Sequence, residues 1–391
     1  TLSVDTVSDI FPSANWAERE AYDQYGVIFL NHPNLKRVLN HKQFVGHPLR
    51  KDYKITQGQI CTETDDLMDE MLPLLKSKGY TDEEIADLML LNVGPSHPAS
   101  HGTIRNFVAL EGETIAACVT EIGYLHRGFE KACEHHTYSQ VIPYTDRLNY
   151  CSAILNNIGW AKAIEDMMKI EITPRAKMIR VVIGELSRII DHFVCNAANM
   201  VDLGGLTSLW YLFGARDQAY DLLSKLTGAR LTNTYTRIGG LEFDLYDGFD
   251  KDLEEVLKTS EKAIEDVLSL IAHNKLFHDR TQDVGVIKAD FALANGISGP
   301  NLRAAGVAHD LRKDKPYYGY ENFDFDLVIG SHGDVYDRMM CRFEESIQSI
   351  KIIRQAMKNM PDGAINVYAP NLVLPNKKDV YGNIEGLMNQ F

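Results

Sequence analysis

Apolar residues recur at helical spacing through the middle of the chain. After Thr173-Pro174, Val182, Leu186, Ile189 and Phe193 stand three or four positions apart, which is typical of a helix with one apolar face. Threonine is a good helix N-cap, and proline is favoured at the first helical position. The pattern therefore predicts a long helix that begins at the proline.

Three further stretches have the same helical pattern. They run from about 146 to 169, from about 206 to just before Gly228, and from about 249 to 273. The glycine after the second stretch is a typical helix C-cap. Long helices with apolar faces that follow one another in sequence predict a helical bundle between about 128 and 275.

The N-terminal part is more mixed. A short helix is predicted over 12–25, followed by a strand over 27–30, and weaker helical patterns cover 65–76 and 81–90, the last with a Thr81-x-x-Glu84 capping box. Alternating residues at 103–110 and 114–121, separated by Glu111-Gly112-Glu113, predict a β-hairpin. The fold class expected is α+β, mainly α, with a small antiparallel hairpin or sheet near the N-terminus.

The composition of the chain limits the kinds of molecule that it can bind. The net charge is −14 and 45% of the 391 residues are hydrophobic, so the chain can bury a large core under an acidic surface. Such a surface is repelled by nucleic acid and by anionic lipid heads. No apolar run reaches the roughly 18–20 residues that span a bilayer. Work at a membrane would require docking onto an embedded protein.

The ends and the cysteines add two expectations. No signal peptide is visible, and the chain begins with Thr1 rather than methionine, so a trimmed start is expected. No Cys-x-x-Cys pair occurs, which argues against zinc, iron–sulfur ligation and a disulfide framework. The six scattered cysteines, expected as reduced thiols, are Cys61, Cys118, Cys133, Cys151, Cys195 and Cys341.

One loop combines two histidines with two prolines. His97 and His101 have the spacing of a metal pair on a helix, but Pro95 and Pro98 disfavour a regular helix there. The segment is better interpreted as a rigid loop that holds imidazoles beside the hairpin. A structural and a functional role fit these residues equally well.

Other polar residues stand near the predicted bundle. Tyr150 is expected near the apolar face of its helix, where a core role is common, and Asp202 fits a helix N-cap. Arg127 and Arg147 fit ordinary ion pairs. No Gly-x-Gly-x-x-Gly after a strand, P-loop or serine elbow occurs, so a redox role would need electrons from a neighbouring chain.

Several segments together resemble the quinone-reducing D subunit of bacterial NADH:quinone oxidoreductase (complex I). The resemblance runs in order over 93–391, and residues 14–53 are similar to the C-terminal tail of the C subunit. The chain is therefore expected to be a fused C/D polypeptide with a C-like tail over 1–53, a linker over 54–92 and an incomplete D-like module over 93–391. The segments that carry the resemblance are Gly94–Arg105, Glu121–Gly128, Pro143–Tyr150, Gly184-Glu185, Asp202–Gly204, Gly333–Arg338 and, for the tail, Trp16, Glu18–Glu20 and Gly46–Tyr53.

The resemblance implies roles for particular residues. Tyr150 and His101 would hydrogen-bond the two carbonyl oxygens of a quinone (ubiquinone or menaquinone), and Asp202 would pair with His101. This makes chemical sense, because quinone reduction needs proton donors aimed at the developing oxyanions. Arg127 and Arg147 would face the terminal 4Fe-4S cluster of the adjacent B subunit. Chamber and loop residues would be His97, Gly102, Arg105 and Asp146.

The resemblance also implies a place in the cell and a set of partners. The partners would be the iron–sulfur B subunit, the I and G subunits of the peripheral arm, and the membrane-embedded H subunit at the quinone entrance. The chain would be peripheral, on the cytoplasmic side of the bacterial inner membrane, and would take part in ion translocation. It would itself bind no metal and no nucleic acid.

The family shares its fold with nickel–iron hydrogenase large subunits, and this gives a rival hypothesis. Hydrogenases hold nickel through two Cys-x-x-Cys pairs, and Cys151, near the first such position, has no partner three residues away. A non-catalytic scaffold that docks an iron–sulfur protein, and a relative fed by reduced ferredoxin, are further alternatives. The chain departs from the family's pattern at Thr232, at His332 and in ending at Phe391, about a quarter short of the usual D module.

Overall fold

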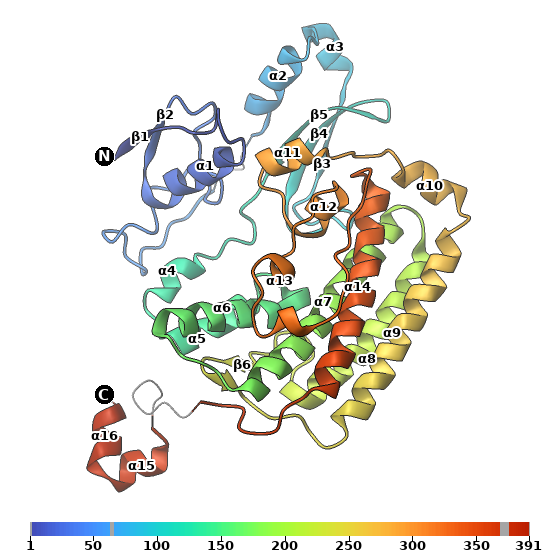
Figure 1. The fold of residues 1–391 in the computed structure, drawn as a ribbon. Helices are drawn as coiled ribbons and strands as arrows, with labels where there is room; N and C mark the ends of the chain where they lie inside the picture. Colours follow the sequence, from blue (N-terminus) through green and yellow to red (C-terminus); the bar gives the residue numbers. More distant parts are fainter. Residues whose placement is uncertain (1, 63–65, 368–374, 391) are drawn as a thin grey trace. The chain divides into compact units, whose positions relative to one another are not determined.

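The computed structural model describes residues 2–62, 66–367 and 375–390. The chain divides into two compact units, each treated by itself below: residues 1–136 with 293–297, and residues 137–292 with 298–391. Helices predominate, and the strands of the described residues form three small sheets (Figure 1). The predicted α+β, mainly α fold class is confirmed.

The N-terminal segment of the first unit is built around one helix. Helix α1 (Ala14–Tyr25) ends at Gly26, whose φ of 76° suits glycine. Strand β1 (Ser3–Asp5) pairs in parallel with β2 (Ile28–Leu30). The predicted helix and strand are confirmed, with starts one or two residues later than expected.

The rest of the first unit is an antiparallel sheet with helices. Its strands are β3 (Met89–Val93), β4 (Arg105–Glu111) and β5 (Thr114–Glu121), in the order β3-β4-β5. Its helices are α2 (Met68–Ser77), α3 (Asp82–Asp87) and α4 (Phe129–Cys133). The hairpin and the capping box at α3 are confirmed. The helix predicted over 81–90 ends at Asp87, because strand β3 begins at Met89. The start predicted for α2, at residue 65, lies outside the described residues.

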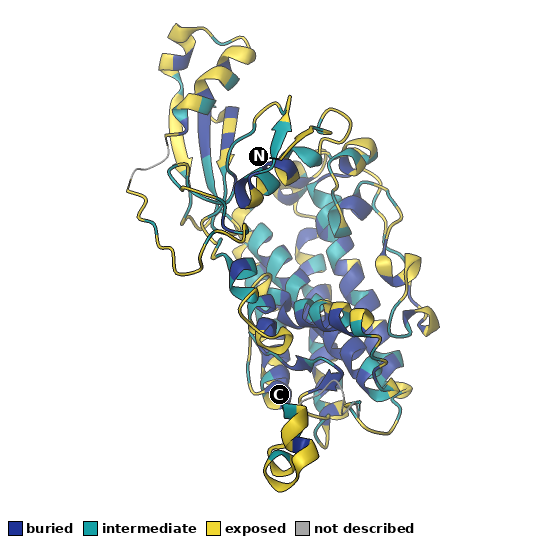
Figure 2. Ribbon diagram, turned by 90° about the vertical axis from the view of Figure 1, so that its left-hand side faces the viewer, coloured by how far each residue is buried: buried dark blue, intermediate teal, exposed yellow. Residues whose placement is uncertain are grey.

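A small apolar core joins α2 to the sheet. Met71 and Leu75 of α2 are fully buried and cluster with Phe107, Ala109 and Ala117 of the hairpin. Figure 2 shows this division, with buried positions on the middle strand and exposed ones on α2, α3 and the edge. One face of the hairpin is therefore apolar and covered, as its alternating pattern requires.

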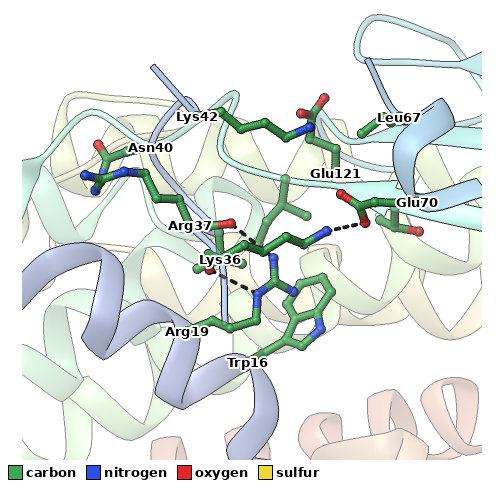
Figure 3. Close-up of a pocket in the computed structure, with 12 residues that line it drawn as sticks. Trp16, Arg19, Lys36, Arg37, Asn40, Lys42, Leu67, Glu70 and Glu121 are labelled. Atoms are coloured by element: carbon green, nitrogen blue, oxygen red, sulfur yellow. Dashed lines mark hydrogen bonds and ion pairs between the residues drawn. The ribbon is translucent and has the colours of Figure 1, made fainter. Parts of the chain in front are cut away.

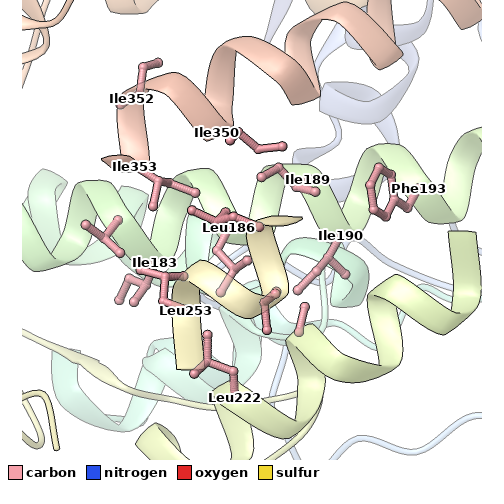
Figure 4. Packing of buried hydrophobic residues seen from close by; sticks show 14 of the residues in the cluster. Ile183, Leu186, Ile189, Ile190, Phe193, Leu222, Leu253, Ile350, Ile352 and Ile353 are labelled. Carbon is pink, nitrogen blue, oxygen red and sulfur yellow. The ribbon is translucent and has the colours of Figure 1, made fainter. Parts of the chain in front are cut away.

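The second unit is a bundle around one central helix. Helix α7 (Pro174–Asp202) packs against α6 (Ala153–Met168), α8 (Leu206–Thr227) and α14 (Val335–Lys358), and α9 (Phe249–Ile271) packs against α8 (Figure 1). Ile183, Leu186 and Ile190 of α7 meet Leu222, Leu253 and Ile353 of its neighbours in one large core (Figure 4). The predicted helical bundle is confirmed.

The helix predicted from residue 146 begins later. Residues 150–152 form a 3-10 turn, η1 (Tyr150–Ser152), and a separate helix, α5 (Tyr138–Thr145), precedes it. No element was predicted after about residue 275. The remaining elements are β6 (Thr236–Arg237), β7 (Gly240–Leu241), α10 (Lys275–Thr281), α11 (Ala289–Ala294), α12 (Gly299–Ala304), α13 (Leu311–Asp314), η2 (Tyr320–Asn322), α15 (Lys377–Gly382) and α16 (Ile384–Gln390).

A cluster of charges lies inside the bundle. The fully buried Glu185 of α7 accepts hydrogen bonds from Arg312 (3.0 Å), Tyr320 (2.6 Å) and Ser349 (2.6 Å). Arg312 also pairs with Asp310 at 2.7 Å. Buried ions of this kind are retained when every partner is satisfied, so the carboxylate fixes how three distant segments meet.

None of the described helices is both long enough and apolar enough to cross a lipid bilayer.

Candidate functional site

The histidine loop joins β3 to β4 and is not helical. Gly94 has a φ of 103°, and a Cβ there would lie 1.9 Å from the carbonyl oxygen of Ile104, so only glycine fits. The amide of Ala99 donates to Nδ1 of His97 at 3.2 Å, which turns that imidazole onto its own loop. His101 and Gly102 are exposed. The expected non-helical loop is confirmed, and its rigidity and quinone role remain predictions.

Arg105, at the end of this loop, ties the sheet together. Its Nε donates to Oδ1 of Asn92 on β3 at 2.9 Å, and its Nη1 lies 3.3 Å from Oε2 of Glu121 on β5. Glu121 also accepts from the hydroxyl of Tyr124 at 2.5 Å. Burial and this hydrogen bond raise the pKa of Tyr124 to about 12. Arg105 thus anchors both strands that carry the loop.

Tyr150 is exposed rather than buried against a helix face. It opens η1, and 57% of its surface is accessible. The turn is fixed by Asn149, whose side-chain amide donates to Ser152 Oγ (2.7 Å) and to Asp191 Oδ2 on α7 (3.2 Å). The expected place near the apolar helix face is wrong because these bonds stop the helix before Ala153. The phenol is consequently presented on a fixed turn beside α7.

Asp202 is the last residue of α7 and is exposed. The N-cap interpretation is wrong, because the following helix α8 starts at Leu206 after a turn in which Gly204 has a φ of 91°. A carboxylate at a helix C-terminus faces the negative end of the helix dipole, which is unfavourable. Asp202 follows Asp191 by eleven residues on the same helix, which corresponds to a rise of roughly 16 Å along the helix axis.

Asp146 and Arg147 follow α5 and differ sharply in exposure. Asp146 is fully buried, whereas the Arg147 side chain is 47% exposed and lies 3.6 Å from Asp146 Oδ2. Within the described residues no hydrogen bond of good geometry reaches the Asp146 carboxylate, although the Asn157 side chain and the Thr234 backbone lie close enough to favour its charged form. Burial raises the pKa of Asp146. Arg147 donates to the Pro143 carbonyl at 2.7 Å, which leaves its charge at the surface.

Asp146→Asn is expected to raise the melting temperature of the protein at pH 8. Because burial raises the pKa of Asp146 in the folded state, folding favours the protonated carboxyl, and this stability is lost as pH rises through that pKa. The amide removes the charge at nearly constant volume. The gain, measured by thermal unfolding, should shrink as pH falls toward 4.

The control for this experiment is Asp166→Asn, at an exposed carboxylate that pairs with Lys162 at 2.9 Å. This variant should show no pH-dependent gain in melting temperature. An unchanged or lower melting temperature for Asp146→Asn at pH 8 would show that Arg147 fully compensates the buried charge.

The Gly333–Arg338 segment forms the start of α14. Asp334 is its N-cap and accepts from the Asp337 amide at 2.8 Å, while Asp337 accepts from the amides of Ser331, His332 and Gly333. These hydrogen bonds from backbone amides hold the pKa of Asp337 below its usual range. The segment is thus a helix cap in this structure. His332 is exposed and bonds Ser331 Oγ at 2.9 Å.

Asn149, Asp191 and Asn157 were missed by sequence reasoning. Asn149 and Asp191 fix the turn that carries Tyr150. They stand 42 residues apart in sequence, and no local sequence pattern indicates that they interact. In residues 2–62, 66–367 and 375–390 no group of three His, Cys, Asp or Glu side chains is placed to hold a metal ion. His101 and Arg127 belong to the first unit, whereas Tyr150, Arg147 and Asp202 belong to the second.

Comparison with known proteins gives consistent matches along the chain. Residues 1–59 match the family described as respiratory-chain NADH dehydrogenase, 30 Kd subunit, and residues 202–391 match the 49 Kd subunit. The chain is 50% identical over its whole length to the fused C/D subunit of NADH-quinone oxidoreductase from Bdellovibrio bacteriovorus, of which it covers 69%. The corresponding protein of Psychrobacter cryohalolentis is 39% identical and 67% covered. The D subunit of NADH-quinone oxidoreductase from Pelobacter propionicus is 46% identical over 78% of this chain, which covers 75% of that protein.

Proposed function

Because this chain belongs to the family of fused C/D subunits of NADH-quinone oxidoreductase, respiratory complex I, we propose that it forms the quinone-reduction chamber of that enzyme. In this proposal Tyr150 and His101 hydrogen-bond the two carbonyl oxygens of the quinone, and Asp202 pairs with His101. The quinone takes up two electrons and two protons and leaves as the quinol. The chain itself supplies proton donors and positioning rather than electrons.

The observation that carries this proposal is the way α7 places two exposed polar groups. The turn that bears Tyr150 is pinned to Asp191 in the middle of α7, and Asp202 ends the same helix. Asp202 is proposed to balance the positive charge that His101 gains when it accepts a proton.

Arg127 and Arg147 are proposed to face the terminal 4Fe-4S cluster of the neighbouring B subunit. The exposed guanidinium of Arg147, held at 2.7 Å from the Pro143 carbonyl, supports this role. Positive charge beside a cluster stabilises its reduced form by simple electrostatics. His97, Gly102, Arg105 and Asp146 are proposed to shape the chamber wall. No metal ligand set is assigned to this chain.

The same family membership supports a wider assembly. We propose contacts with the B, I and G subunits, with the membrane-embedded H subunit at the quinone entrance, and a peripheral place on the cytoplasmic side of the bacterial inner membrane. Quinone reduction would be coupled there to ion translocation. The proposed modules are a C-like tail over 1–53, a linker over 54–92 and a D-like module over 93–391.

Asp202→Asn tests the proposed function in the assembled enzyme. The amide keeps the size of the side chain but cannot balance a protonated His101, so the rate of quinone reduction should fall by on the order of tenfold or more. Reduction of an artificial acceptor that takes electrons upstream of the quinone should keep its normal rate. Both rates are measured on the same membranes.

Asp217→Asn is the matched control, since Asp217 is an exposed carboxylate on α8 that pairs with Arg230 at 2.8 Å. It should leave both rates unchanged. Full quinone reduction with native quinone affinity in Asp202→Asn would contradict the assigned role.

A further inference from the structure

A small cleft in the first unit is lined by an unusual number of cations. It lies between α1, the loop after β2, the start of α2 and the end of β5, and its cavity volume is about 40 Å³. Figure 3 shows Trp16 and Arg19 rising from α1 beside Lys36. We call it the Arg19 cleft; its charged and aromatic lining residues are Trp16, Arg19, Lys36, Arg37, Lys42, Glu70 and Glu121.

Arg19 is the most buried of these cations, with 7% of its surface accessible. Its Nε donates to the Lys36 carbonyl at 3.3 Å and its Nη2 to the Arg37 carbonyl at 3.1 Å. Within the described residues its Nη1 has no hydrogen bond, and no carboxylate oxygen lies within 4.0 Å of the guanidinium. Its carbon centre stands 5.5 Å from the Trp16 ring centroid. One edge of the guanidinium is therefore left for another acceptor.

The carboxylates near the cleft are committed to other cations. Glu70 pairs with Lys36. Asp23 pairs with Arg37 at 2.7 Å and accepts from the backbone amides of residues 38–40 at 2.8 to 3.2 Å. Glu121 is held by Arg105 and Tyr124. Within the described part of the chain Arg19 thus has no direct ion pair, although the charges of Glu70 and Asp23 act on it from a greater distance.

A buried charge with no counterion in direct contact is costly, and proteins rarely keep one without a partner. Backbone carbonyls accept hydrogen bonds from Nε and Nη2 of Arg19, but they carry no full negative charge. The planar guanidinium fork matches a carboxylate or phosphate group, which accepts two parallel hydrogen bonds.

We propose that the Arg19 cleft binds an oxyanion, a carboxylate or phosphate group, through the free edge of the Arg19 guanidinium. Lys42 adds positive charge, since Lys36 is paired with Glu70, and the Trp16 ring forms an apolar wall. The oxyanion comes either from a small ion in solution or from an acidic side chain of a neighbouring subunit. Both sources present the same chemistry to Arg19.

Selenate is a suitable probe because selenium can be located by anomalous scattering. Crystals of the assembled enzyme are soaked in selenate, and the cleft is inspected in the wild type, in Arg19→Met and in the control Lys51→Met, whose lysine is 83% exposed. A selenium peak in the wild type and control that is lost in Arg19→Met supports a solution ion. A carboxylate of another subunit within hydrogen-bond distance of Arg19 supports the second source.

Two results would overturn the proposal. One is a cleft with neither selenate nor a foreign carboxylate near Arg19. The other is a selenate peak that persists in Arg19→Met, which would make it an adventitious ion only. If Arg19→Met fails to assemble, Arg19→Lys replaces it: the charge is kept but the fork is lost, and the peak should weaken or disappear.

Discussion

Tyr150→Phe is expected to lower quinone reduction by the assembled enzyme on the order of 100-fold, because a positioned proton donor contributes about that much or more. The phenol is 57% exposed on a turn that Asn149 fixes to α7. Phenylalanine keeps the ring and removes only the donor. The loss should therefore appear in kcat and in quinone affinity, whereas upstream reduction of an artificial acceptor stays normal.

Tyr138→Phe is the matched control for this prediction. Tyr138 is an exposed tyrosine of the same unit, 51% accessible, whose ring packs near Trp160. Its variant should retain the wild-type rate. A Tyr150→Phe enzyme with native quinone reduction and affinity would remove Tyr150 from the chemistry and leave it a structural residue.

Glu185→Gln is expected to destabilise the second unit by about 3 kcal/mol, the usual cost of leaving a buried charge uncompensated. Glutamine can still accept from Tyr320 and Ser349, but the charges of Arg188 and Arg312, at 3.2 Å and 3.0 Å from the carboxylate, lose their partner. A lower melting temperature or denaturant midpoint would show this. The control is Glu261→Gln, an exposed partner of Arg354, which should cost at most about 1 kcal/mol.

The same carboxylate gives a pH dependence with a definite sign. Despite burial, the surrounding arginines and hydroxyls lower the pKa of Glu185 to about 2. A lowered folded-state pKa contributes stability above the unfolded-state pKa and loses it as pH falls toward the folded value. The wild type should therefore lose stability between about pH 4.5 and pH 2, and Glu185→Gln should lose less over that range. Equal acid sensitivity would contradict the role given to Glu185.

The long helices were predictable because their signal is local and repeated. The apolar spacing along α7 and α8 needs only the neighbouring residues, and the caps at Thr173 and Gly228 are local as well. Strand β3 was missed because five mostly apolar residues directly after a helix continue its pattern. The turn at Tyr150 was missed because a bond to Asp191, 42 residues away, sets where the helix begins.

The candidate site was only partly visible in the sequence. Its residues came from resemblance, since an exposed tyrosine and a carboxylate at a helix end carry no distinctive spacing. The interpretation of Asp202 as an N-cap failed because Gly204 and Gly205 extend the turn and place the next helix start at Leu206. What the structure adds is that Asp202 ends the same helix, α7, to which Asn149 fixes the Tyr150 turn.

The partners of Glu185 also determine when this protein can fold during synthesis. Arg312, Tyr320 and Ser349 follow it by 127, 135 and 164 residues. A nascent chain that has released α7 but not the segment from residue 312 onward has only Arg188, on the same helix, to pair with the Glu185 carboxylate in its forming core. We expect the second unit to stay loosely packed on the ribosome until α14 has emerged, and then to consolidate in one late step.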